Sequence, residues 1–184
     1  ILSVDTFRAR VADEVLAAGA HIINDIGTMM LDPDLIEVVS RWQAPYVLMH
    51  NHLQIKADVK YQNLIEDIKR ELVEAMDKAV GAGLPLNRII IDPGIGFGKS
   101  PAQNRLIIKR LADFQTLGRP ILVGASRKSF IGHTLDLDVE ERVEGSLAVA
   151  ALAVVNGAHI LRVHDVKASK RVVLMTEAVM NEDG

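Results

Sequence analysis

The sequence predicts an α/β fold in which short buried strands alternate with helices. Six apolar runs rich in β-branched residues recur along the 184 residues. An amphipathic stretch and then a Gly or Pro separate successive runs, at about 30 residues per strand-and-helix unit. Continuous apolar runs this short are typical of strands buried on both faces of a parallel sheet. The predicted strands cover residues 2–4, 21–23, 46–49, 88–91, 121–123 and 160–163.

The segments between these strands carry helix start and stop signals. Thr6 is expected to cap the first helix, and Gly19 is expected to end it. Pro33 is expected at the first position of the second helix. Ser100 and Pro101 are expected to open the fourth helix. The predicted helices cover about residues 8–18, 32–40, 61–82, 100–114, 139–155 and 167–180, and the segment 51–60 is predicted to be a polar loop.

Charge and composition exclude several classes of function. A net charge of −3 provides no basic field to attract nucleic acid or an anionic membrane. The absence of cysteine excludes a disulfide scaffold, a thiolate metal site and a cysteine nucleophile, and it agrees with a cytoplasmic location. No apolar stretch approaches the ~18 residues of a membrane span. Nucleic acid and membranes are therefore not the expected partners.

The order of the elements leaves two architectures open, a doubly wound open sheet and a closed barrel. In both, right-handed crossovers join parallel strands, and ligands bind at the carboxyl ends of those strands. The chain is shorter than the ~250 residues of a complete eight-unit barrel. Every predicted strand ends in polar residues. Taken together, these ends include His, Lys and Arg, which helix capping would not require. These ends are Asp5 and Thr6, Asn24 and Asp25, His50 and Asn51, Asp92 and Pro93, residues 126–128 and residues 162–165.

Residues 92–99 form a glycine-rich segment after the fourth predicted strand. Its alternating glycines match neither the phosphate-binding loop of nucleotide hydrolases nor the dinucleotide-binding fingerprint. Two interpretations stay open. The backbone approaches a flat ligand closely while Phe97 stacks on it, or the segment is a tight turn and Phe97 belongs to the core.

Three segments together resemble signature motifs of dihydropteroate synthases, namely residues 92–99, 126–132 and 162–165. Residues 3–6, 23–26 and 49–50 match the remaining strand ends of that family in order. The resemblance implies a TIM (β/α)₈ barrel of which this chain supplies strands three to eight. We therefore expect residues 1–184 to form a single pterin-binding barrel domain that is truncated at its N-terminus.

The resemblance also implies the reaction, a step of folate biosynthesis. Dihydropteroate synthases condense 7,8-dihydropterin-6-ylmethyl diphosphate with 4-aminobenzoate, giving 7,8-dihydropteroate and diphosphate. Two alternatives stay open: a methyltetrahydrofolate-binding methyltransferase with a similar barrel, and a non-catalytic fragment that binds pterin. We expect the 184-residue chain alone to be inactive, because an incomplete barrel exposes two sheet edges and lacks two loops.

The resemblance implies a role for each site residue. Asp92 is expected to accept two hydrogen bonds from the donor edge of the pterin, as an ionised carboxylate can. Catalytic roles are expected for Lys128, Asp92, Arg162 and His164. Pterin contacts are expected from Asp5, Asn24, Ile26, Met49, Asp92, Gly96, Phe97 and Lys128. Diphosphate contacts are expected from Arg162, Val163 and His164, and aminobenzoate contacts from Lys128, Ser129 and Phe97.

Each role has a structural alternative. Asp5 and Asp92 are also plausible helix caps, and Ile26 and Met49 plausible core residues. Arg127 is as compatible with a structural ion pair as with ligand binding. His50 and His52 form no convincing metal set on the sequence alone.

The resemblance further implies Mg²⁺ as cofactor and a homodimer formed through the late helices. The expected Asn ligand of Mg²⁺ belongs to the family's first strand, so no metal ligand is assigned in this chain. The family is also the target of sulfonamides. The apolar residues in segments 147–155 and 172–180 are compatible with the dimer.

Overall fold

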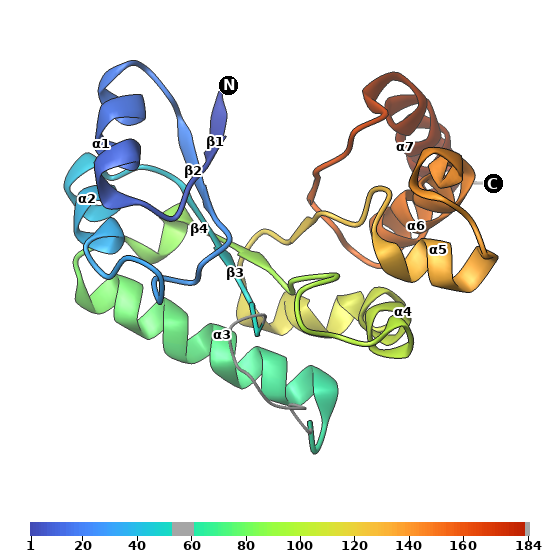
Figure 1. The fold of residues 1–184 in the computed structure, drawn as a ribbon, viewed down its shortest axis with the longest axis horizontal. Helices are drawn as coiled ribbons and strands as arrows, with labels where there is room; N and C mark the ends of the chain where they lie inside the picture. Colours follow the sequence, from blue (N-terminus) through green and yellow to red (C-terminus); the bar gives the residue numbers. More distant parts are fainter. Residues whose placement is uncertain (53–60, 183–184) are drawn as a thin grey trace. The chain divides into compact units, whose positions relative to one another are not determined.

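The computed structural model describes residues 1–52 and 61–182, and the chain divides into two compact units, Ile1–Pro93 and Gly94–Gly184 (Figure 1). Most of the predicted loop 51–60 lies outside the described residues. Both units are built from parallel strands followed by helices, as the sequence predicts.

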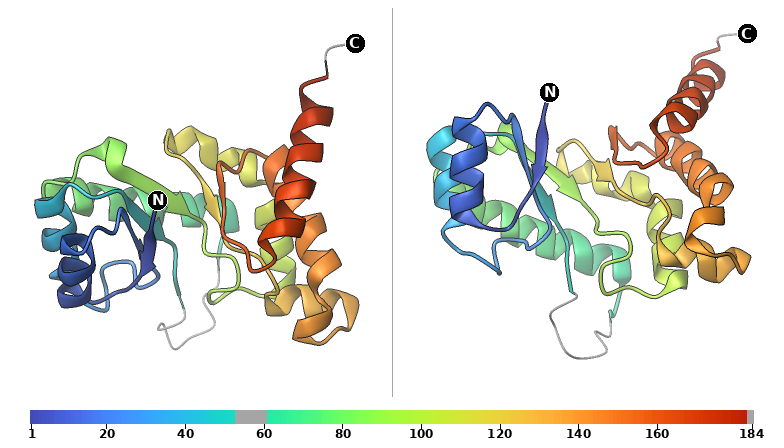
Figure 2. Two further views of the ribbon diagram at one scale, coloured as in Figure 1. Left: turned by 90° about the horizontal axis from the view of Figure 1, so that it is seen from above. Right: turned by 45° about the horizontal axis from the view of Figure 1, so that its top comes forward.

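The first unit is a four-stranded parallel sheet with its strands in chain order, β1-β2-β3-β4. Helices α1, α2 and α3 cover one face of this sheet (Figures 1 and 2). Consecutive parallel strands joined by crossovers of one hand place all their helices on the same side. The strands are β1 (Ser3–Asp5), β2 (Ile22–Asp25), β3 (Tyr46–Met49) and β4 (Ile89–Asp92), and the helices are α1 (Ala9–Ala17), α2 (Leu35–Trp42) and α3 (Leu64–Gly81).

The strand register separates an apolar face of this sheet from a polar one. Ile23, Tyr46 and Ile89 pair side by side, and all three are fully buried. Side chains alternate between faces along a strand, so the next row, which pairs Asp5 with Asn24, points to the opposite face. Asp5 and Asn24, and Asp92 two rows further along, therefore project from the face that the helices leave uncovered.

The second unit pairs β5 (Leu122–Val123) with β6 (Ile160–Leu161) in parallel. Helix α6 packs against α7, and α4 packs against α5 and α6. A 3₁₀ segment, Leu111–Leu117, contributes the fully buried Leu111 and Phe114 to the core. The helices are α4 (Pro101–Lys109), α5 (Ser129–Leu135), α6 (Val143–Val155) and α7 (Val166–Met180).

Some helix ends follow the sequence signals and others do not. Gly19 follows α1 with φ +98°, and Ser100 forms a capping box with Gln103 at the start of α4. Thr6, however, does not cap α1: its hydroxyl accepts from the Arg8 amide, and Arg8 is the N-cap. The carboxylate of Asp32 instead accepts the first amide of the helix, from Ala9, at 2.7 Å.

Three predicted helices have different bounds in the structure. Helix α2 begins at Leu35 rather than at Pro33, with Asp34 as its N-cap. The predicted helix 100–114 divides into α4 and the 3₁₀ segment, and the predicted helix 139–155 becomes a short 3₁₀ turn followed by α6. Helix α5 was not among the six predicted helices. None of the helices in the described part of the chain is long and apolar enough to cross a bilayer.

Candidate active-site residues at the strand ends

Asp5 and Asn24 are joined directly at the ends of β1 and β2. The Asn24 side-chain amide donates to Asp5 Oδ1 at 2.8 Å, and Asn24 is 6% exposed. The helix-cap alternative for Asp5 fails, because Arg8 is the N-cap of α1 and the first amide of the helix donates to Asp32. The bond orients the Asn24 amide so that its oxygen points away from Asp5.

Asp92 and Met49 lie on the same face of the sheet as Asn24. They are register partners on β4 and β3, one pair beyond the Leu48–Ile91 row, and both are buried. The Asp92 carbonyl accepts the amide of His50 at 2.9 Å, which anchors the end of β4 to the chain leaving β3. Asp5, Asn24, Met49 and Asp92 thus share one face of the first unit, while Ile26, half-buried, lies in the loop after β2.

Asp25 projects from the other face and has a structural role. It is fully buried and accepts from the amides of Gly27 (2.6 Å) and Met29 (2.8 Å) and from the Tyr46 hydroxyl (2.6 Å). Burial raises the pKa of Asp25, and the three hydrogen bonds partly offset that rise. Thr28 and Met29 have positive φ, so the carboxylate holds a strained loop in place.

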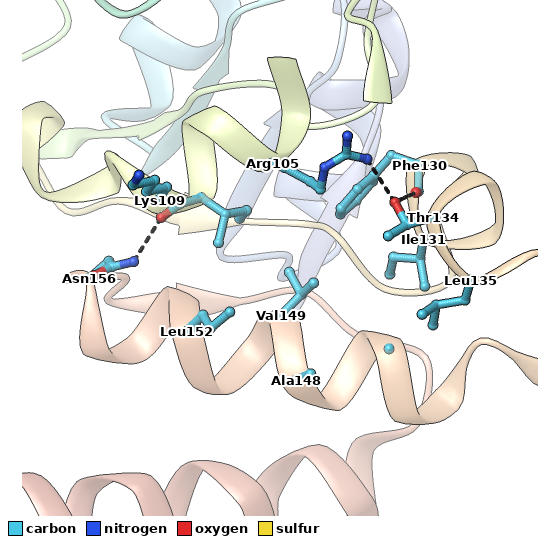
Figure 3. A pocket seen from close by; sticks show the side chains of 12 residues that line it. Arg105, Lys109, Phe130, Ile131, Thr134, Leu135, Ala148, Val149, Leu152 and Asn156 are labelled. Atoms are coloured by element: carbon cyan, nitrogen blue, oxygen red, sulfur yellow. Dashed lines mark hydrogen bonds between the residues drawn. The ribbon is translucent and has the colours of Figure 1, made fainter. Parts of the chain in front are cut away.

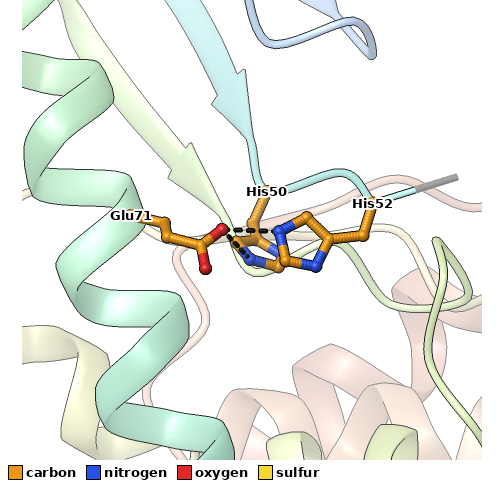
Figure 4. Close-up of side chains that lie close together, drawn as sticks. All are labelled: His50, His52 and Glu71. Carbon is orange, nitrogen blue, oxygen red and sulfur yellow. Dashed lines mark hydrogen bonds and ion pairs between the residues drawn. The ribbon is translucent and has the colours of Figure 1, made fainter. Parts of the chain in front are cut away.

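Two histidines after β3 and one glutamate of α3 form a cluster that the sequence did not reveal (Figure 4). Glu71 Oε2 lies 3.0 Å from His50 Nε2 and 2.5 Å from His52 Nε2. Tyr61 OH lies 3.0 Å from His52 Nδ1, and the two rings stack. The hydrogen bond from His50 contributes most to lowering the pKa of Glu71 to about 2, and His52 lowers it further. Glu71 belongs to a different element, so the histidine spacing alone could not identify it.

In the second unit, the glycine-rich loop is held rigidly by its own side chains. Gly94, Gly96 and Gly98 all have positive φ, which explains their alternation. Asn104, which is 2% exposed, accepts from the Gly96 amide at 2.7 Å and donates to two carbonyls of the same loop. Lys99 Nζ donates to the carbonyls of Gly94 and Phe97. Asn104 is therefore a positioning residue that the sequence analysis missed.

Lys128 lies against this loop. Its ammonium donates to the Ile95 carbonyl and lies 4.0 Å from the centre of the Phe97 ring, a cation–π contact. A Cβ at Gly96 would lie 2.6 Å from Lys128 Cδ, so the lysine side chain passes where only glycine leaves space. Lys128 is thus a positioned cation rather than a freely solvated one, and Phe97 supports it.

Arg127, by contrast, forms a structural ion pair. Its guanidinium makes two hydrogen bonds to Asp165, at 2.9 and 2.7 Å. The pair lowers the pKa of Asp165. The Arg127 amide donates to Ser146 and its carbonyl accepts from Arg142, so its backbone contacts fix the loop before α5.

The end of β6 carries the second predicted cluster of the unit. His164 Nδ1 lies 3.0 Å from Ser126 Oγ, and the same oxygen accepts the His164 amide at 3.3 Å. With the serine hydroxyl donating to Nδ1, the ring hydrogen is on Nε2, which is then a donor. Arg162 and His164 are exposed and alternate along the chain, with the Val163 backbone between them. Ser129 is the first residue of α5 and is exposed.

The second unit also contains an apolar cavity of about 470 Å³ among α4, α5 and α6 (Figure 3). Its polar contacts are internal: Arg105 donates to Thr134, and Asn156 donates to the Ile108 carbonyl. None of the predicted site residues lines it. This cavity is therefore separate from the strand-end chemistry.

Comparison with known proteins decides the family. The sequence model of pterin-binding enzymes matches residues 1–164, a stretch that includes every strand of both units. This chain belongs to the pterin-binding enzyme family. All the predicted site residues lie within the matched stretch.

Individual pterin-binding enzymes are similar over nearly the whole chain. The dihydropteroate synthase of Bacillus subtilis is 44% identical over 183 residues, which cover 100% of this chain and 63% of the Bacillus protein. The Yersinia pestis dihydropteroate synthase in complex with a sulfonamide drug is 38% identical, with a TM-score of 0.94 over 98% of this chain and 66% of its own. The Xanthomonas albilineans enzyme in complex with 7,8-dihydropteroate is 39% identical, with a TM-score of 0.92 over 99% and 68%.

These similarities confirm the predicted fold class, because this chain aligns with the βα units of dihydropteroate synthases over nearly all of its length. The family resemblance inferred from the ordered strand ends is likewise confirmed. The chain spans just under two thirds of the length of the Bacillus relative.

Proposed function

We propose that the whole protein to which this chain belongs is a dihydropteroate synthase of folate biosynthesis. It would condense 7,8-dihydropterin-6-ylmethyl diphosphate with 4-aminobenzoate and release diphosphate. The observation that carries the proposal is the buried polar face of the first unit, where Asn24 and Asp92 lie among apolar residues at the ends of β2 and β4, the parallel strands on either side of β3. A buried carboxylate and amide at strand ends suit a flat, donor-rich ligand.

In this proposal the first unit recognises the pterin. The Asp92 carboxylate accepts from the 2-amino and N3 donors of the ring, and the Asn24 amide, oriented by Asp5, makes a further contact. Met49 and Ile26 supply apolar walls. Because the carboxylate is buried, a ligand that lacks the two donors would lose both of these charge-assisted hydrogen bonds at a large cost in binding.

The second unit would supply cations and anion contacts. Lys128, positioned by Ile95 and Phe97, donates to the pterin carbonyl, while Gly96 and Phe97 bound the ring. The Arg162 guanidinium, the Val163 backbone and the Nε2 hydrogen of His164 hold the departing diphosphate. Lys128, Phe97 and the Ser129 hydroxyl receive the aminobenzoate, whose amine attacks the methylene carbon as the carbon–oxygen bond to diphosphate breaks. Charge stabilisation and orientation then carry the rate, without a side-chain nucleophile.

Mg²⁺ and a cytoplasmic location also belong to this proposal. Mg²⁺ prefers oxygen ligands. Among the described residues, the cluster that could ligate a metal is His50, His52 and Glu71, and two of its three ligands are imidazoles. The residues of this chain therefore do not fit a Mg²⁺ site by themselves, and no step of the reaction above depends on one.

The methyltransferase alternative is less well supported. Such an enzyme expels no diphosphate and has no need of the Ser126–His164 contact beside Arg162. A non-catalytic pterin-binding protein would retain the Asp92 face and fail to turn over. Product analysis separates these three outcomes.

The test is Asp92→Asn in the full-length protein, with Asp77→Asn on the exposed face of α3 as the matched control. The substitution keeps the shape and places an amide donor against the donors of the pterin, so kcat/KM should fall by about 1,000-fold or more. Asp77→Asn should leave dihydropteroate formation and diphosphate release unchanged. Near-normal turnover by the Asp92 variant would refute the pterin assignment, and binding without diphosphate release by the parent would refute the enzyme.

We also propose that a second copy of the chain covers the outer face of α6 and α7. Helix α6 is apolar all round from Leu147 to Val155, which is typical of a buried helix, yet Leu152 is 53% exposed. Met175 and Val179 of α7 line the adjoining groove and are more than 60% exposed. In sedimentation, Met175→Glu should convert a dimer to a monomer, whereas Val80→Glu on α3 should not. A monomeric parent protein would refute this part.

A further inference from the structure

The His50, His52 and Glu71 cluster lies on the helix-facing side of the first unit, apart from the polar face that carries Asp92. His50 continues the alternation of β3 one residue beyond Met49, so its side chain points toward α3, where Glu71 lies. His50 and His52 are buried, and the Glu71 side chain is 34% exposed. The mechanism proposed above uses none of these three residues.

The donor set of this cluster is that of a transition-metal site. Two imidazole nitrogens and one carboxylate oxygen, one from each side chain, lie within 4.8 Å of one another (Figure 4). Two histidines and a carboxylate are ligands that Zn²⁺ and related divalent ions favour, whereas Mg²⁺ and Ca²⁺ favour oxygen alone.

The two distances from Glu71 to the histidines require only a small expansion. Ligand atoms about 2.0–2.2 Å from a tetrahedral Zn²⁺ lie roughly 3.3 Å from one another. Glu71 Oε2 now lies 3.0 Å from His50 Nε2 and 2.5 Å from His52 Nε2, the spacing of hydrogen bonds. Each of these two separations therefore has to widen by less than about 1 Å, which a rotation of the partly exposed Glu71 side chain provides.

Tyr61 completes the arrangement as an orienting partner. Its hydroxyl lies 3.0 Å from His52 Nδ1, and the two rings stack at 5.7 Å. Metal-bound histidines generally donate their other ring hydrogen to a fixed oxygen, which selects the tautomer that presents a lone pair to the metal. Tyr61 OH is such an oxygen. With the ring hydrogen on Nδ1, His52 Nε2 would present its lone pair to the metal.

We propose that His50, His52 and Glu71 bind a divalent transition-metal ion of the Zn²⁺ class. The three ligands leave a fourth tetrahedral position for water. All three ligands line a cavity of about 570 Å³, together with Met29 and Lys78 among others, which leaves room for such a water. The ion would tie the end of β3 to α3, independently of whether the dihydropteroate synthase proposal holds.

The test measures Zn²⁺ binding to the full-length protein by equilibrium dialysis, with Co²⁺ absorption as a report on geometry. The parent should bind one Zn²⁺ per chain at this site, tightly and in the presence of excess Mg²⁺. Glu71→Gln should weaken binding by about 100-fold or more, and Tyr61→Phe by about 10-fold, the range for an orienting partner. His21→Ala, which changes an exposed histidine of the same unit, should leave the affinity unchanged.

Each outcome of these measurements either supports the metal site or overturns it. Intense visible Co²⁺ bands that Glu71→Gln abolishes, with secondary structure retained, support a tetrahedral site. A parent dissociation constant weaker than about 10 μM, or equal affinity in the parent and Glu71→Gln, shows that the cluster is held by hydrogen bonds alone and overturns the proposal. If Glu71→Gln fails to fold, the comparison of Tyr61→Phe with His21→Ala decides in the same way.

Discussion

Removing the Tyr46 hydroxyl should weaken the first unit through Asp25. Tyr46→Phe leaves the fully buried ring in place and deletes one of the three hydrogen bonds that Asp25 accepts. A hydrogen bond to a charged group is worth about 1.5–3 kcal/mol, so the free energy of unfolding should fall by about that amount. Urea unfolding followed by circular dichroism, at pH 7.5, measures the change.

The same variant should show a definite pH dependence. Burial raises the pKa of folded Asp25 above its ordinary 3.8, so folding favours the protonated form and this carboxyl costs stability as the pH rises through its folded pKa. The Tyr46 bond lowers that pKa, and its loss raises the pKa further. The stability gap between parent and variant should therefore widen toward neutral pH and narrow in acid.

A double-mutant cycle with Asp25→Asn isolates the contact. The coupling energy between the two positions should exceed 1 kcal/mol, because both groups are buried and directly bonded, as is usual for residues of one network. A coupling energy below about 0.5 kcal/mol, or a gap that grows in acid, would refute the account of Asp25 as a buried ionised anchor.

Three further predictions concern the second unit. Gly96→Ala should lower stability more than Gly118→Ala and should also reduce turnover of the full-length enzyme. Both glycines have positive φ, but only the methyl group added at position 96 would collide with Lys128. Equal effects in the two variants would contradict this. Asn104→Ala should reduce the free energy of unfolding by about 1–3 kcal/mol in urea titrations, since it removes the partner of part-buried backbone groups in the glycine-rich loop. Arg127→Ala should return the pKa of Asp165 toward 3.8 in carboxyl NMR titrations, so the stability that the pair contributes above that pH is lost.

The sequence predicted the alternation of elements and the strand ends well, because both depend on local patterns. Tyr46–Met49 has the predicted bounds, and the other strands differ by one or two residues. The capping box at Ser100 was also predictable, since Ser, Pro and Gln occupy the required positions in four consecutive residues. Helix α5 was not predicted as a helix, because seven residues show too little periodicity to distinguish a helix from a turn.

What the sequence could not provide is contact between elements. Asp25 follows Asn24 at the end of the same predicted strand, yet the two side chains point to opposite faces, and only the structure shows the Tyr46 hydroxyl against Asp25. Glu71 escaped notice because its approach to His50 depends on how α3 lies on β3. Arg127 could not be assigned until Asp165 was seen beside it.

The chain-order sheet of the first unit also has a consequence for how the protein acquires its structure. Ser3 pairs with Ile22, Ile23 with Tyr46, and Tyr46 with Ile89, so each strand needs only its immediate predecessor as a template. Loop closures of this kind are short, and folding rates rise as contacts become more local. During synthesis β2, β3 and β4 would therefore each add to the strand before them, and Asp92 would join the polar face only when β4 docks.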